Sequence, residues 1–137
     1  MSPSANNFCR VLYVEDTPED QRMLGEAVGI ARVPLEIAPA SSAEAALTML
    51  GSGDHFNALV LDWNLPAVTG IEFLTRVRAT HPRIPVLILT GEPATVDLPG
   101  AMLLGAETVV AKPLTLDHWV RLARLVHGFC EDVQISG

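Results

Sequence analysis

The sequence has few basic residues and no long apolar run. Only 9 lysines and arginines stand against 16 acidic residues, so the net charge is −7 and the isoelectric point is about 4.9. Direct binding to nucleic acid is therefore not expected, because phosphate contacts need patches of lysine and arginine. No apolar run approaches the roughly 20 residues of a membrane span, and the opening residues MSPSANNF lack a basic start and an apolar signal core. We expect a cytoplasmic protein without a membrane partner.

The chain has only two cysteines, Cys9 and Cys130, which lie near its opposite ends. No metal-type spacing links them, and a disulfide is not expected in a cytosolic protein. We therefore interpret both residues as reduced, structural thiols.

The sequence does contain enough apolar material for a buried core. Of its 137 residues, 49% are hydrophobic and 18% are charged, which suits one folded domain and argues against disorder. We expect a single domain over residues 9–130, a disordered or irregular N-terminus over residues 1–8 and a C-terminal tail over residues 131–137.

Five short apolar runs alternate with segments of helical period. The runs lie at residues 11–14, 35–38, 58–61, 86–89 and 109–111. Continuous apolar runs are typical of strands that helices cover on both faces, whereas Leu35-Glu36-Ile37-Ala38 alternates and indicates an edge strand. Five strand–helix units predict an α/β fold with a doubly wound, parallel sheet.

Capping residues predict where the first helices begin. Thr17 precedes a proline and two acids, which is typical of a hydroxyl-capped start with acids against the helix dipole. Ser41-Ser42-Ala43-Glu44 has the pattern of a capping box for the second helix. The third helix stops before Pro82. Pro99-Gly100 interrupts the fourth, which we expect to begin only at about Leu98.

The fifth helix is expected to start near Thr115. Its apolar residues recur at helical spacing and define an inner face. That face comprises Leu116, Trp119, Val120, Ala123 and Val126.

Polar residues stand where four of the five predicted strands end. In a doubly wound sheet, ligands bind beyond the carboxyl ends of the strands, so these residues are the ones to inspect. They are Glu15 and Asp16 after the first strand, Asp62 after the third, Thr90 after the fourth and Lys112 after the fifth.

Three carboxylates at one edge repel one another, and a raised pKa or a bound cation must relieve the repulsion. Oxygen ligands favour a hard cation such as Mg²⁺, with Mn²⁺ as an alternative. A carboxylate beside Mg²⁺ can act as a nucleophile toward phosphorus, and Lys112 can hold a phosphoryl oxygen. This chemistry gives a reason for Asp62 to end a hydrophobic strand.

Each of these residues also has a structural interpretation when taken alone. The acids after the first strand could simply begin a helix, Asp62 could cap a loop, Thr90 could lie in a turn and Lys112 could be a solvated strand end. Their joint occurrence at successive strand ends favours a functional site.

The combined pattern resembles the receiver domain of two-component response regulators. It consists of the acid pair, Asp62 followed by Pro66 and Gly70 at intervals of four, then Thr90, then Lys112-Pro113, and the match runs from about Cys9 to Phe129. The stretch Asp62-Trp63-Asn64-Leu65-Pro66 is most similar to the chemotaxis-type, stand-alone regulators. The resemblance implies a flavodoxin-like (βα)5 fold with strand order 2-1-3-4-5, so that the receiver domain would span residues 9–130.

The resemblance also implies a role for each residue. Asp62 would be the phosphoacceptor, taking a phosphoryl group from the phosphohistidine of a sensor histidine kinase or phosphotransfer protein. Asp16, Asp62 and the main-chain carbonyl of Asn64 would bind Mg²⁺, with Glu15 acting through water. Thr90 and Lys112 would contact the phosphoryl oxygens. Asn64 and Glu92 would tune the rates.

The resemblance implies an output by contact with an unidentified downstream protein, from a monomer or weak homodimer. The activity would be self-phosphotransfer and self-hydrolysis of the aspartyl phosphate, without turnover of a separate substrate. One departure stands out, since the family usually has an aromatic switch residue three positions before the lysine, and this chain has Val109.

We also interpret Trp63 as an exposed loop aromatic and the histidines as surface or helix-end residues without a ligand role.

Three alternatives remain. The first is an interaction scaffold of receiver fold that works independently of phosphorylation. The second is a hydrolase of the haloacid dehalogenase type, which wants a second aspartate where this chain has Asn64. The third is a flavodoxin-like flavin carrier, whose phosphate the acids at Glu15 and Asp16 would repel.

Overall fold

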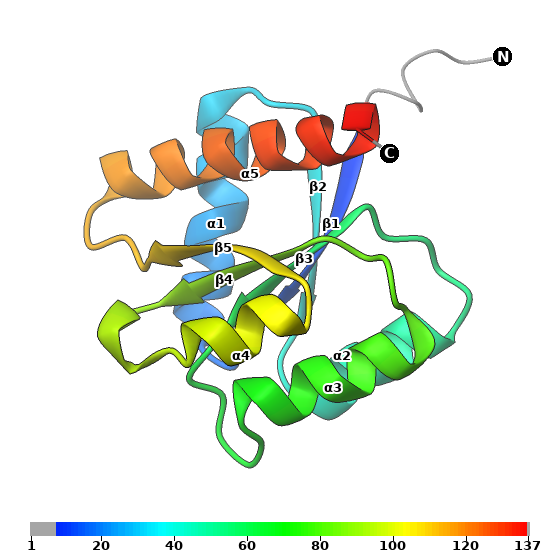
Figure 1. The fold of residues 1–137 in the computed structure, drawn as a ribbon. Helices are drawn as coiled ribbons and strands as arrows, with labels where there is room; N and C mark the ends of the chain where they lie inside the picture. Colours follow the sequence, from blue (N-terminus) through cyan, green and yellow to red (C-terminus); the bar gives the residue numbers. More distant parts are fainter. Residues whose placement is uncertain (1–7, 137) are drawn as a thin grey trace, which may run out of the picture.

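A computed structural model describes residues 8–136 and contains five strands and five helices in alternation (Figure 1). The irregular N-terminus expected for residues 1–8 lies outside the described residues except for Phe8. The elements are β1 (Cys9–Val14), α1 (Pro18–Ala31), β2 (Leu35–Ala40), α2 (Ala43–Gly51), β3 (Ala58–Asp62), α3 (Gly70–Thr80), β4 (Val86–Thr90), a 3₁₀ turn (Pro93–Thr95), α4 (Leu98–Leu103), β5 (Ala106–Ala111) and α5 (Leu116–Ser136).

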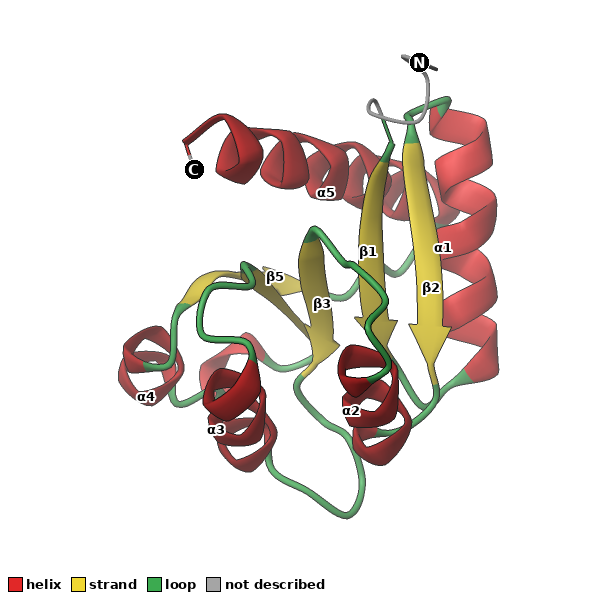
Figure 2. Cartoon of the chain, turned by 90° about the vertical axis from the view of Figure 1, so that its right-hand side faces the viewer, coloured by secondary structure: helices red, strands yellow, loops and turns green. Residues whose placement is uncertain are grey.

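The five strands form one parallel sheet in the order β2-β1-β3-β4-β5, which confirms the predicted fold class and strand order. Helices α1 and α5 cover one face of the sheet, and α2, α3 and α4 cover the other (Figures 1 and 2). Each face has its own core of buried apolar side chains. The arrangement is therefore three layers, with the sheet in the middle.

The central strand β3 is apolar up to its last residue, Asp62, because both of its faces are buried. Leu59 and Leu61 belong to the core beneath α2, α3 and α4, whereas Ala58 and Val60 belong to the core beneath α1 and α5. At the edge, β2 alternates buried and exposed positions, as its sequence predicts.

Two of the predicted helix caps are wrong in detail. Thr17 occupies the N-cap position of α1, but its side chain makes no capping hydrogen bond. Helix α2 is capped by Ser42, whose hydroxyl accepts from the Ala45 amide at 3.0 Å. The expected capping box does not form, because the N-cap is Ser42 and the third helical position is therefore Ala45. Glu44 pairs with Arg76 of α3 at 2.9 Å.

The C-terminal elements depart from the sequence pattern at three points. Strand β5 begins at Ala106, before the predicted residues 109–111, because pairing with β4 extends it through polar residues. Helix α4 does begin at Leu98, as expected. Leu116 is 46% exposed and does not belong to the inner face of α5, although Trp119, Val120, Ala123 and Val126 are buried as predicted. Helix α5 extends to Ser136, through the segment that the sequence assigns to a tail.

Cys9 and Cys130 are both free and buried, in agreement with the expected reduced thiols. They meet in the core beneath α1 and α5, where β1 begins and α5 nears its end. Burial raises the pKa of the Cys130 thiol, and its hydrogen bond with Cys9 raises it further. Thiolate formation at Cys130 is therefore suppressed at neutral pH.

We expect Cys130 to resist thiol reagents in the folded protein. At about pH 8, its reaction with a disulfide reagent such as dithionitrobenzoate should be at least about a hundredfold slower than in urea-unfolded protein, because only the thiolate reacts. Release of the coloured thiolate measures both rates. Equal rates in the two states would show that the thiols are accessible.

Arg78 of α3 ties together two loops at the amino-terminal edge of the sheet. Its guanidinium donates to the carbonyls of His81 at 3.1 Å and Ile84 at 2.7 Å, and also to those of Leu104 and Gly105. These carbonyls belong to the α3–β4 and α4–β5 connections. Each would lose a charged donor if Arg78 were removed.

Arg78→Ala should therefore lower the free energy of unfolding by about 2 to 3 kcal/mol, since half-buried carbonyls would be left without partners. Urea titration followed by circular dichroism measures this change. Arg76→Ala is the matched control on the same helix, because Arg76 makes only an exposed ion pair worth less than about 1 kcal/mol. Similar losses in the two variants would contradict the assigned role of Arg78.

Candidate functional site

Three carboxylates gather at the carboxyl-terminal edge of the sheet. Glu15 and Asp16 directly follow β1, and Asp62 is the last residue of β3. Carboxylate oxygens of these three residues all lie within 4.8 Å of one another. Glu15 is fully buried and Asp62 is 3% exposed, whereas Asp16 is exposed. The structure thus brings together the three acids that the sequence singled out.

Strand register explains why these acids meet. Val14 pairs with Leu61, so the residues that follow, Glu15 and Asp62, emerge side by side. Backbone pairing continues past each acid, because the Glu15 amide donates to Ala40 at 2.9 Å and the Trp63 amide donates to Leu89 at 3.0 Å. The acids are therefore held by the rigid sheet itself.

The chemistry and the spacing of the three acids both fit a hard divalent cation. Carboxylate oxygens are the ligands that Mg²⁺ prefers, and opposite ligands of one Mg²⁺ lie about 4.2 Å apart. The oxygens of the three acids lie within 4.8 Å of one another, which is close to that separation. Among residues 8–132, whose side chains the structure describes, no other group of three such ligands occurs. The main-chain carbonyl of Asn64 stays a predicted ligand.

Glu15 places its carboxyl group in a fully buried position. Its oxygens accept hydrogen bonds from the Tyr13 hydroxyl at 3.0 Å and the Thr17 amide at 3.2 Å. Burial raises the pKa of the Glu15 carboxyl, while the Lys112 ammonium opposes that rise. Burial and the neighbouring Glu15 together raise the pKa of the Tyr13 phenol, so Tyr13 remains a donor.

Lys112 supplies the positive charge of the site, as predicted. Its ammonium lies 2.8 Å from Glu15, 2.8 Å from Asp20 and 3.4 Å from Asp62. Burial by itself would lower the pKa of the ammonium, but the hydrogen bonds to Asp20 and Glu15 and the charge of Asp62 raise it. The Lys112 amide also donates to the Thr90 carbonyl at 2.7 Å, which fixes the chain after β5 beside β4.

Asp20 is the member of the site that sequence reasoning missed. It lies in the first turn of α1 and was interpreted only as an acid that favours the helix dipole. Asp16 lies before the N-cap of α1, so no helical spacing in the sequence links Asp20 to the acids of the site. The side chain of Asp20 is 25% exposed, and it contacts the site through Lys112.

Thr90 ends β4 with its side chain fully buried. Its hydroxyl accepts from the Asn64 side-chain amide at 3.2 Å and from the Glu92 amide at 3.1 Å. The Asn64 backbone amide in turn donates to Asp62 at 3.1 Å. Asn64 therefore links the acid at the end of β3 to the hydroxyl at the end of β4.

Trp63 is not the exposed loop aromatic expected from the sequence. It is half-buried and packs against the core beneath α2, α3 and α4. A Cβ atom added at Gly70 would lie 2.4 Å from the Trp63 ring, so only glycine fits there. This contact packs the loop after Asp62 against the start of α3.

Val109 is also half-buried and packs against the same core as Trp63.

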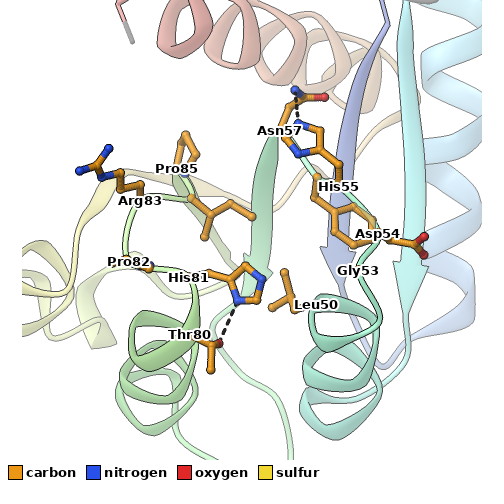
Figure 3. A pocket seen from close by; sticks show the side chains of 12 residues that line it. Leu50, Gly53, Asp54, His55, Asn57, Thr80, His81, Pro82, Arg83 and Pro85 are labelled. Carbon is orange, nitrogen blue, oxygen red and sulfur yellow. Dashed lines mark hydrogen bonds between the residues drawn. The ribbon is translucent and has the colours of Figure 1, made fainter.

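A hollow lies away from the carboxylates, between the loops that precede β3 and β4 (Figure 3). It has a volume of about 740 Å³. His55 and His81 line it. A hydrogen bond of 3.2 Å joins His55 to Asn57, and one of 2.8 Å joins His81 to Thr80. Because these loops lie at the amino-terminal edge of the sheet, the hollow is separate from the acidic site.

No helix within residues 8–136 combines the length and the apolar character that a membrane crossing needs.

Comparison with known proteins gives a consistent result. The sequence model of the response regulator receiver domain matches residues 11–124. Chemotaxis protein CheY of Pseudomonas aeruginosa is 41% identical over 80 residues, which are 57% of this chain and 64% of that protein. Transcriptional regulatory protein TcrA of Mycobacterium tuberculosis is 33% identical over 109 residues, 79% of this chain and 42% of that protein. The chain thus spans less than two thirds of the length of these relatives.

Solved structures agree on the fold. Chemotaxis response regulator CheY4 of Vibrio cholerae superposes with a TM-score of 0.72 at 25% identity, covering 87% of this chain and 98% of that one. A CheY-like receiver domain protein of Methanospirillum hungatei superposes with a TM-score of 0.78 at 19% identity, covering 95% of this chain and 99% of that one.

The contact between Gly70 and Trp63 can be tested by adding one methyl group. Gly70→Ala should lower the free energy of unfolding by about 2 kcal/mol, because the Trp63 ring must move out of its packed position. Gly29→Ala is the control, since nothing lies within 4 Å of its added Cβ and alanine favours an exposed helix by about 0.5 to 1 kcal/mol. Thermal unfolding measures both variants, with the combined emission of Trp63 and Trp119 as a second readout. An unchanged Gly70→Ala variant would contradict the contact.

Proposed function

The chain belongs to the response regulator receiver family, and we propose that it is a phosphoacceptor switch in which Asp62 receives a phosphoryl group from a phosphohistidine. The observation that carries this proposal is the environment of Asp62. This nearly buried carboxylate ends a central strand, beside two further acids and the Lys112 ammonium. The donor would be a sensor histidine kinase or a phosphotransfer protein.

In the proposed reaction, a carboxylate oxygen of Asp62 attacks phosphorus while the bond from phosphorus to the donor imidazole nitrogen breaks. The electron pair of that bond stays with the imidazole, and an aspartyl phosphate results. The Lys112 ammonium lies 3.4 Å from Asp62 and would neutralise charge on the transferred phosphoryl oxygens. Glu15, Asp16 and Asp62 would hold Mg²⁺, which supplies further neutralisation when bound.

The proposed switch begins at Thr90. Its hydroxyl accepts hydrogen bonds from the Asn64 side chain and from the Glu92 amide. Thr90 ends the strand next to the one that Asp62 ends. Contact between Thr90 and a phosphoryl oxygen would exchange these partners and so would shift the loop that follows β4. Such a shift between two populations would alter the surface offered to a downstream protein.

Phosphoryl transfer can be measured by the intact mass of the protein after incubation with phosphoramidate or acetyl phosphate. The wild type should gain one phosphoryl group, and removal of Mg²⁺ by a chelator should slow the gain at least about a hundredfold. Asp62→Asn should gain none, because its amide oxygen is a poor nucleophile. Asp54→Asn, which changes an exposed carboxylate near the hollow in Figure 3, should behave as the wild type.

A gain of phosphate by Asp62→Asn would refute the assignment of the acceptor. A wild type that takes no phosphoryl group from either donor, or from a panel of purified phosphorylated phosphotransfer domains, would refute the proposed function.

A receiver-fold scaffold that ignores phosphate is the second candidate, and Val109 is the observation that favours it. A half-buried valine stands where the family usually has an aromatic switch residue. Under this alternative, Asp62→Asn and the wild type would bind a downstream partner with equal affinity, with or without phosphoryl donor. Under the proposed function, the phosphorylated wild type differs from both.

A further inference from the structure

The ammonium of Lys112 is shared unequally among three carboxylates. Its distances to Glu15 and Asp20 are both 2.8 Å, which is typical of a strong charged hydrogen bond. Its distance to Asp62 is 3.4 Å, well outside that range. The strongest contacts of the ammonium are therefore with Glu15 and Asp20, and its contact with Asp62 is the weakest of the three.

Asp20 stands apart from the group that fits a cation. The oxygens that lie within reach of a common ion come from Glu15, Asp16 and Asp62, and Asp20 is not among them. Asp20 comes from the first turn of α1, whereas Lys112 follows β5. Within the site Asp20 contacts the Lys112 ammonium, so we expect any effect of Asp20 on the cation to pass through that ammonium or through charge alone.

An ammonium and a divalent cation compete for the same carboxylates. If Asp20 were neutral, the ammonium would keep only Glu15 and Asp62 as charged partners, and both are needed for the cation. We propose that Asp20 is a positioning residue that holds the Lys112 ammonium toward α1 and so leaves Asp62 available to a divalent cation and a phosphoryl group. The inference rests on the proposed function in one respect, because Asp62 needs to be available to a phosphoryl group only if the chain accepts one.

The test is a titration with Mg²⁺ alone, followed by backbone amide spectra of ¹⁵N-labelled protein. Asp20→Asn should weaken Mg²⁺ binding about fivefold, because the ammonium then occupies the cation ligands. Glu19→Gln is the matched control, since it removes the same charge from an exposed neighbour in the same helical turn. Its effect should stay within about twofold. Asp20→Glu, which keeps the carboxylate, should recover most of the affinity.

A double-mutant cycle separates positioning from simple charge. In a Lys112→Met background, Asp20→Asn should change Mg²⁺ binding by less than about twofold, because the group through which Asp20 acts is gone. An equal loss in both backgrounds would overturn the proposal, as would tighter binding in Asp20→Asn.

Phosphorylation kinetics supply an independent readout. Asp20→Asn should need more Mg²⁺ for half-maximal rate and should approach the wild-type rate at saturation. A wild type that binds Mg²⁺ but accepts no phosphoryl group would refute the proposed function, while the Mg²⁺ titration would still decide the role of Asp20. A lower maximal rate at saturating Mg²⁺, with unchanged Mg²⁺ affinity, would overturn the positioning role.

Discussion

The carboxyl-terminal edge of the sheet depends on one positive charge. The Lys112 ammonium lies within 3.4 Å of Glu15, Asp20 and Asp62, and the first of these is fully buried. Carboxylates at such spacing repel one another, and burial makes their ionised forms more costly. The ammonium offsets this cost, which allows charged residues to end apolar strands. Any cation or phosphoryl group that binds must share the same carboxylates, so stability and chemistry are coupled here.

The backbone around this charge cluster is held by contacts that lie outside it. Parallel pairing places Glu15 beside Asp62, and Asn64 joins Asp62 to the Thr90 hydroxyl. The loop after Asp62 is seated by the contact between Trp63 and Gly70. These contacts limit the movement of Asp62, while the hydroxyl of Thr90 is held by hydrogen bonds from Asn64 and Glu92. A rigidly held carboxylate beside a hydroxyl that could exchange its partners suits the proposed two-state switch.

Much of the fold could be predicted from the pattern of apolar runs. The runs in β1, β3 and β4 are continuous because both faces of these strands are buried, and β2 alternates because it lies at an edge. Prediction failed where a residue's role depends on a distant partner. Glu44 lies one position too early for a capping box and pairs with Arg76, and Leu116 lies on the exposed side of α5. Neither outcome has a local signal, because each depends on how whole helices pack.

The sequence by itself determined the strands and the residues that end them. Because parallel strands present their carboxyl ends at one edge, it also determined that Glu15, Asp16, Asp62, Thr90 and Lys112 would share that edge. Only the tertiary structure decided how the ammonium is divided among the acids and that Asp20 takes part. Lys112 and Asp20 are 92 residues apart in the chain. Their contact depends on where α1 and the end of β5 are placed by the packed core, and no periodicity in the sequence encodes that placement.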